Sequence, residues 1–115
     1  MRHDRLSTTI GGRRCVPTMY GTIARIQPRA DRLEELIAHT RRTEYGSVPG
    51  FRASYLFRPD RNPYDKPTAF LVALFDDEAS YRANANSPEQ HDRYLELRAL
   101  LEADPEWMDG TFDGV

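Results

Sequence analysis

A run of seven apolar residues, Ala69 to Phe75, constrains the fold of this chain more than any other feature. The run is long enough for a β-strand and too short to span a membrane. Because successive side chains of a strand point to opposite faces of a sheet, an unbroken apolar run predicts a strand that is buried on both faces. The chain has 115 residues, of which 39% are hydrophobic, so it can build a single domain with one small core around this strand.

Two helix starts follow the apolar run. Asp76 or Asp77 is placed to cap a first helix, because a carboxylate accepts hydrogen bonds from the free amides of a first helical turn. Ser87 and Gln90 have the spacing of a reciprocal cap for a second helix, and Pro88 stands at the first helical position, where a missing N–H costs nothing. The second helical region is therefore predicted to be split in two.

The rest of the chain supplies three more strands and an earlier helix. Alternating side chains predict strands at residues 20–26, 51–58 and 106–112. Apolar residues recur at helical spacing within residues 29–45, which predicts the first helix. The order strand, helix, strand, strand, helix, strand is the split βαβ arrangement of ferredoxin-like α+β folds, in which helices cover one face of a four-stranded antiparallel sheet.

Two helical regions cannot cover both faces of such a sheet. The central strand is apolar on both faces, so we expect a second copy of the chain to cover the other face in an obligate homodimer joined through the sheets. A charge at Phe70 or Val72, on the face predicted to lie away from the helices, is expected to dissociate the pair or unfold it.

Residues 1–18 differ from the rest in charge, with four arginines against one aspartate. We expect a disordered basic extension there, before a domain at residues 19–115, or alternatively a protein that starts at Met19. The extension has no interleaved aromatic residues and the whole chain has a net charge of −2, so neither nucleic acid nor membrane is an expected partner. No apolar run has the length of a signal peptide, and Cys15 is the single cysteine, so a free thiol in a cytoplasmic protein is expected.

Three stretches resemble the antibiotic biosynthesis monooxygenase-like (ABM) proteins of the dimeric α+β barrel superfamily: YGTIARIQP at 20–28, VPGF at 48–51 and FLVALFDDEASYRANANSPEQHDRY at 70–94. The resemblance covers residues 19–115. It implies a homodimer with a pocket between the sheet and the helices of each chain. Members include cofactor-independent oxygenases of electron-rich phenols or quinols, haem-degrading enzymes and small proteins without a known substrate.

The haem-degrading branch of that family uses an asparagine on the first strand and a tryptophan and a histidine in the second helical region. In this chain residues 19–27 contain no asparagine, and the only tryptophan, Trp107, lies in the last predicted strand. Only His91 matches, which argues against haem degradation.

Three residues of the second helical region are candidate catalytic residues. His91 lies in the first turn of the capped helix, and an imidazole, with an ordinary pKa near 6.5, is suited to take a proton from a phenol or quinol. Tyr81 and Asn84 are i, i+3 neighbours that share a helix face and can orient a substrate oxygen. The alternatives are a histidine bonded to a neighbour on a helix flank, a packed tyrosine and an asparagine that ends a helix.

Tyr20 and Trp107 are candidate substrate-binding residues. The family fold places the first and last strands side by side, so both rings can line a pocket for a flat aromatic molecule, or else belong to the core. The acidic cluster at residues 76–78 is interpreted as helix capping rather than as paired catalytic carboxylates. His39, on the first helix, is expected to be structural or exposed.

Two functions remain open. The first is a cofactor-independent monooxygenase-like enzyme acting on a small electron-rich phenol or quinol, whose own electrons reduce oxygen. The second is a non-catalytic homodimer that binds a small aromatic molecule. Motifs for metal, nucleotide or nucleophilic-serine chemistry are absent from the sequence, so no cofactor is expected.

Overall fold

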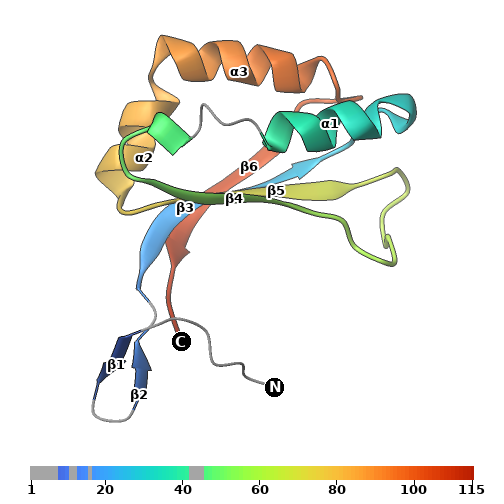
Figure 1. Ribbon diagram of the computed structural model, residues 1–115. Coiled ribbons are helices and arrows are strands. Elements are labelled where there is room, and N and C mark those ends of the chain that lie inside the picture. The colour runs from blue at the N-terminus through green and yellow to red at the C-terminus, as the bar shows by residue number, and fades with distance from the viewer. Residues whose placement is uncertain (1–7, 11–12, 16, 42–45) are drawn as a thin grey trace.

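The computed structural model describes residues 8–10, 13–15, 17–41 and 46–115. Its main body has two layers, a four-stranded antiparallel sheet and three α-helices that all lie on one face of the sheet (Figure 1). The predicted α+β ferredoxin-like arrangement is therefore confirmed.

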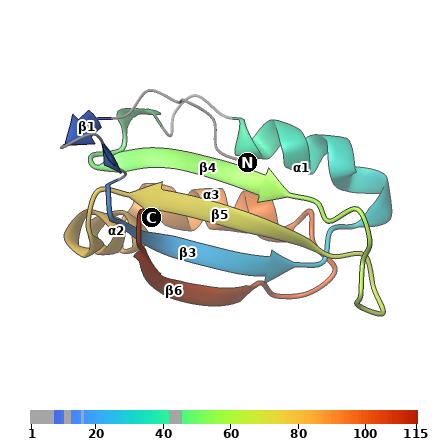
Figure 2. The same ribbon diagram turned by 90° about the horizontal axis from the view of Figure 1, so that it is seen from below.

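The strands lie in the order β4, β5, β3, β6 (Figure 2). Their bounds are Met19–Ile26 for β3, Phe51–Phe57 for β4, Ala69–Phe75 for β5 and Glu106–Phe112 for β6. Every neighbouring pair is antiparallel. The apolar run is β5, which lies inside the sheet between β4 and β3.

Helices α2 (Glu78–Ala85) and α3 (Pro88–Arg98) start where their caps predict. The Asp77 carboxylate accepts a hydrogen bond from the amide of Ser80 at 2.9 Å, and the Ser87 hydroxyl oxygen accepts one from the amide of Gln90 at 3.1 Å. Each side chain satisfies an amide that has no partner within its helix. The second helical region is split as predicted.

The reciprocal half of the predicted cap at Ser87 is wrong. The Ser87 amide donates to the carbonyl oxygen of Asn84 at 3.0 Å, so it is satisfied without the Gln90 side chain. Gln90 Oε1 instead accepts hydrogen bonds from the side chains of Asn84 and Arg93. One contact with α2 and one within α3 have replaced the predicted cap.

The first helix is shorter than residues 29–45. A 3₁₀ turn, η1 (Ala30–Arg32), leads into α1 (Leu33–Thr40). The Thr40 hydroxyl donates to a carbonyl oxygen of the preceding turn at 2.7 Å, a contact that competes with helix continuation. Residues 42–45 lie outside the described part of the chain.

The core fills the space between the sheet and the helices. Leu36 of α1 and Leu101, after α3, are fully buried against Ala24 and Ile26 of β3. Gly50 precedes β4 with a φ of 78°, a conformation that L side chains rarely adopt, and this turn brings the chain into the sheet at Phe51.

The other face of the sheet has no helix on it. Tyr55, Val72, Ile23 and Met108 form one row of paired residues across the four strands, and the adjacent row of Leu56, Leu71, Ala24 and Trp107 faces the helices. On the uncovered face Tyr55 is 59% and Met108 66% exposed, while Phe70 and Val72 are half-buried.

Two short strands precede the sheet. β1 (Thr8–Ile10) and β2 (Arg13–Cys15) pair antiparallel, and Figure 1 shows them away from the two layers. This hairpin lies within the segment expected to be a disordered extension; residues 1–7 are outside the described part. None of the described helices has the length and apolar character needed to cross a membrane.

Candidate functional site

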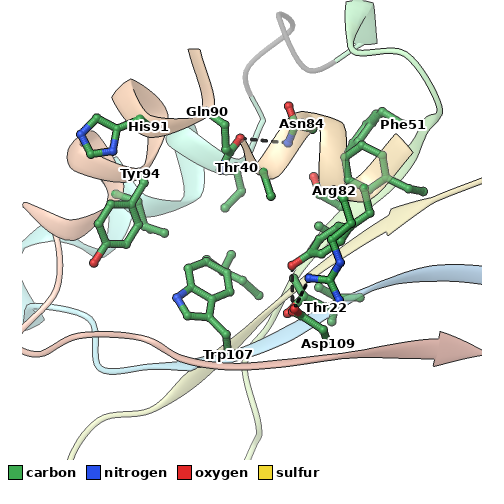
Figure 3. A pocket seen from close by; sticks show the side chains of 18 of the residues that line it. Thr22, Thr40, Phe51, Arg82, Asn84, Gln90, His91, Tyr94, Trp107 and Asp109 are labelled. Carbon is green, nitrogen blue, oxygen red and sulfur yellow. Dashed lines mark hydrogen bonds and ion pairs between the residues drawn. The ribbon is translucent and has the colours of Figure 1, made fainter. Parts of the chain in front are cut away.

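A cavity of about 470 Å³ lies between the sheet and the helices (Figure 3). Side chains from α1, α2, α3 and all four strands of the main sheet line it. Its volume is in the range of small-molecule sites, which bury an organic ligand between apolar walls and orient it with a few polar groups.

Aromatic side chains form much of the cavity wall. They come from β4, β5, α2, α3 and β6 and are Phe51, Phe75, Tyr81, Tyr94 and Trp107. The rings of Tyr94 and Trp107 lie 6.4 Å apart at 48°. Trp107 is 48% exposed, so it forms a wall of the cavity and is not a residue of the closed core.

Tyr20 is not among the residues that line the cavity. Strands β3 and β6 are neighbours, but Tyr20 pairs with Thr111, whereas Trp107 pairs with Ala24. Four residues of strand therefore separate the two aromatic residues, roughly 13 Å at ~3.3 Å per residue. The structure does not bring Tyr20 and Trp107 together.

Arg82 and Asp109 lie at one end of the cavity (Figure 3), and with Tyr81 they form a polar cluster. The Tyr81 hydroxyl donates to Asp109 Oδ1 at 2.8 Å, and Arg82 donates to Asp109 Oδ2 at 3.0 Å. Arg82 also donates to the Tyr20 hydroxyl oxygen at 2.8 Å, and its guanidinium lies 5.5 Å from the centre of the Tyr20 ring. The cluster joins α2 to β6 and β3.

The charges in this cluster are fixed near neutral pH. Burial, with a smaller effect from the hydrogen bond to Asp109, raises the pKa of Tyr81 to about 12, so the phenol keeps its proton. Burial works against ionisation of Asp109, but hydrogen bonds from Tyr81, Thr22 and Arg82 together lower its pKa below the usual value. Tyr81 is thus no base, and Asp109 is a stabilised carboxylate with weak basicity.

A second polar network lies where α2 meets α3. Arg93 donates to Asn84 Oδ1 at 3.0 Å and to Gln90 Oε1 at 3.1 Å, and Asn84 Nδ2 donates to Gln90 Oε1 at 3.2 Å. Asn84 and Gln90 line the cavity, and Arg93 is buried behind them. The oxygen and the amide nitrogen of Asn84 are both engaged within the protein.

His91 lines the cavity from the first turn of α3 and is exposed. Its imidazole has no hydrogen bond or ion pair with any residue in the described part of the chain, so the ring is open to a ligand. His39 differs, since it is buried, and its Nε2 lies 3.3 Å from the Arg93 carbonyl oxygen. A carbonyl only accepts, so His39 donates there and links α1 to α3.

The acidic cluster at residues 76–78 caps a helix, as its position in the sequence predicts. Asp77 caps α2, and hydrogen bonds from Ser80 lower its pKa. Asp76 pairs with Arg52 at 3.4 Å. Within the described ranges, no three His, Cys, Asp or Glu side chains gather as a metal site would require.

No known family profile matches the chain, and no curated protein matches it in sequence. Solved structures do match. A conserved protein from Methanosarcina mazei has a TM-score of 0.67 at 15% identity, over 80% of this chain and 90% of that chain. SnoaB, a cofactor-independent oxygenase from Streptomyces nogalater, has a TM-score of 0.58 at 18% identity, over 87% and 95% of the two chains.

A protein from Chloroflexus aurantiacus, provisionally named an antibiotic biosynthesis monooxygenase, has a TM-score of 0.58 at 23% identity, over 84% of this chain and 95% of that chain. The chain has the ABM fold. The resemblance noted in the sequence is therefore confirmed for the fold. At such identities similarity establishes the fold alone, so a function has to be argued from the cavity.

Proposed function

We propose that this protein is a cofactor-independent monooxygenase-like enzyme acting on a small electron-rich phenol or quinol bound in the cavity. The observation that carries the proposal is the cavity itself, which has aromatic walls suited to a flat ring and an open imidazole, that of His91, at its edge. The fold shared with SnoaB, a cofactor-independent oxygenase, supports the same reaction class.

In the proposed reaction the substrate supplies the electrons. His91 takes the proton of a ring hydroxyl, and the electron-rich phenolate then reacts with molecular oxygen. One oxygen atom enters the ring as a carbonyl, and the other leaves as water with two hydrogen atoms of the substrate, so a phenol becomes a quinone. The protein contributes the base, the orientation of the ring and a site sheltered from bulk water.

The polar groups of the cavity divide the remaining tasks. Tyr81 donates its proton to Asp109, so toward a ligand its oxygen is an acceptor for a second ring hydroxyl. Asn84 was a candidate for direct orientation, but its engaged amide indicates an indirect contribution through Gln90. Trp107 forms a wall for the ring, whereas Tyr20 has no direct contribution because it lies outside the cavity.

The test combines binding with oxygen uptake. Trp107 is the only tryptophan, so a ligand in the cavity changes the single intrinsic indole emission. A panel of naphthols and dihydroxynaphthalenes is titrated while dissolved oxygen is recorded. We expect saturable quenching together with oxygen uptake by metal-free and flavin-free protein. Quenching without uptake by any member would make the protein the non-catalytic aromatic binder.

We also propose that two copies pair through the uncovered face of the sheet. Large apolar side chains are exposed there, with Tyr55 at 59%, Phe57 at 56% and Met108 at 66%. An exposed apolar face of this kind marks an interaction surface in a folded protein. A second copy offers the same surface, and two-fold pairing of identical patches is the commonest symmetric assembly.

A further inference from the structure

The orientation of two amide side chains at the cavity is fixed by Arg93. The Arg93 residue is 8% exposed, and it donates to Asn84 Oδ1 at 3.0 Å and to Gln90 Oε1 at 3.1 Å. A guanidinium can only donate, so each amide must turn its oxygen toward it. The hydrogen bonds from Arg93 therefore fix which atom of each amide is the oxygen and which is the nitrogen.

This arrangement determines what Gln90 offers to a ligand. Its Oε1 accepts from Arg93 and from Asn84 Nδ2, so both hydrogen bonds lie on the oxygen. The amino group, Nε2, has no partner among the described residues, and Gln90 is part of the cavity lining. Donation from a guanidinium also polarises the amide, which strengthens its N–H groups as donors.

We infer that Gln90 is the donor that recognises an acceptor oxygen on the aromatic ligand, a ring carbonyl or a phenolate, and that Arg93 is its positioning residue. The inference rests on the proposed function in needing a ligand in this cavity, and it adds which ligand oxygen is recognised and by which group. Both the phenolate formed by loss of a proton and the quinone product carry such an oxygen. Asn84 assists by holding Gln90 Oε1.

A matched pair of rigid probes tests this. Fluorenone and fluorene have the same ring skeleton, but fluorenone has a carbonyl group where fluorene has a methylene group. Binding is measured by calorimetry and by Trp107 emission, and the quantity compared is the ratio of the two affinities. Overall affinity changes with packing, whereas this ratio changes only with recognition of the carbonyl oxygen.

Gln90→Glu is the decisive variant. Its carboxylate keeps the size of the side chain and can still accept from Arg93 and Asn84, but it has no N–H to donate. We expect the fluorenone preference to fall roughly three- to tenfold, the usual contribution of one net hydrogen bond. The matched control is Glu89→Gln, the reverse exchange at the exposed neighbouring residue outside the cavity lining, which should leave the ratio unchanged.

Arg93→Lys tests the positioning role, because a lysine ammonium cannot hold two amides in a fixed plane. The preference for fluorenone should fall while fluorene affinity stays within about twofold. If this buried variant does not fold, Asn84→Ala removes one of the two supports of Gln90 and should lower the ratio in the same direction.

The outcomes separate the claims. Fluorene binding with an unchanged ratio in Gln90→Glu overturns the role of Gln90 and leaves the cavity as a ligand site. An unchanged ratio in folded Arg93→Lys, or in Asn84→Ala where the former does not fold, overturns only the positioning step. Failure of the wild-type protein to bind either probe removes the ligand site, and with it both the inference and the proposed function.

Discussion

The hydroxyl of Tyr81 on α2 donates a 2.8 Å hydrogen bond to Oδ1 of Asp109 on β6, across 28 residues of sequence. The bond fixes a phenol that keeps its proton against a carboxylate that keeps its charge. It therefore gives this end of the cavity a structural role, and His91, the proposed base, lies on the opposite side of the site (Figure 3).

Tyr81→Phe tests this interpretation. Removal of the hydroxyl should lower the free energy of unfolding by about 1 kcal/mol, because a hydrogen bond to a charged acceptor is lost at a partly exposed position. Urea denaturation measures the change. Tyr94→Phe is the control, since the Tyr94 hydroxyl has no hydrogen-bond partner among the described residues. Unaltered stability with a hundredfold loss of oxygen uptake would instead place Tyr81 in the chemistry.

The stability of the protein should depend on Asp109 in a pH-dependent way. The folded-state pKa of Asp109 is lowered, so its contribution is complete above the unfolded-state value of about 3.9 and is lost as pH falls through the folded-state pKa. Asp109→Asn should be less stable than wild type at pH 7, and the difference should shrink below about pH 4. Urea midpoints at pH 7, 5 and 3 measure it.

The control for this series is Asp113→Asn. Asp113 is exposed and forms no ion pair or side-chain hydrogen bond within the described residues. Its substitution should leave the pH dependence of the wild type intact. A difference between Asp109→Asn and wild type that stays constant from pH 7 to pH 3 would show that the carboxylate charge does not stabilise the fold.

Local sequence rules predicted the elements well because the interactions that start them are local. The seven apolar residues of β5 match the strand, and the caps at Asp77 and Ser87 place the starts of α2 and α3. Each of these features depends on residues no more than a few positions apart. The end of the first helix was overestimated, since periodicity alone does not include the competing hydrogen bond of the Thr40 hydroxyl.

The site was less predictable because its contacts join distant residues. Alternation placed Trp107 and Asp109 on one face of the last strand, but nothing local indicated that Tyr81 would reach Asp109. The spacing of Ser87 and Gln90 predicted a reciprocal cap, but Gln90 instead bonds to Asn84 of the preceding helix and to Arg93 within its own helix. Adjacency of two strands does not fix their register. Tyr20 and Trp107 were both candidates to line a pocket, but they lie four strand residues apart and only Trp107 lines the cavity.

Tyr55→Asp tests the proposed dimer. Tyr55 is 59% exposed in the single chain, so a charge there costs the fold little, yet in a sheet-to-sheet dimer it would be buried without a partner. We expect wild type to sediment as a dimer at micromolar concentration and Tyr55→Asp as a folded monomer. Glu96→Asp, on the exposed side of α3, should remain dimeric. A monomeric wild type would refute the proposed pairing.

His91→Ala tests the proposed base. A positioned general base contributes about 10²–10⁴-fold, so oxygen uptake should fall by that factor while the fold and probe binding remain. Because the His91 ring is exposed at the cavity, imidazole added to the buffer should restore part of the rate.

The matched control is Asp92→Ala, at the next residue of α3, which is exposed and lies outside the cavity lining. Its uptake should stay within about twofold of wild type, because it removes a side chain from the same helical turn without touching the site. If His91→Ala keeps the wild-type rate, the histidine is not the base. Deprotonation would then have to come from solvent, since Asp109 is held as a weakly basic carboxylate and Tyr81 retains its proton.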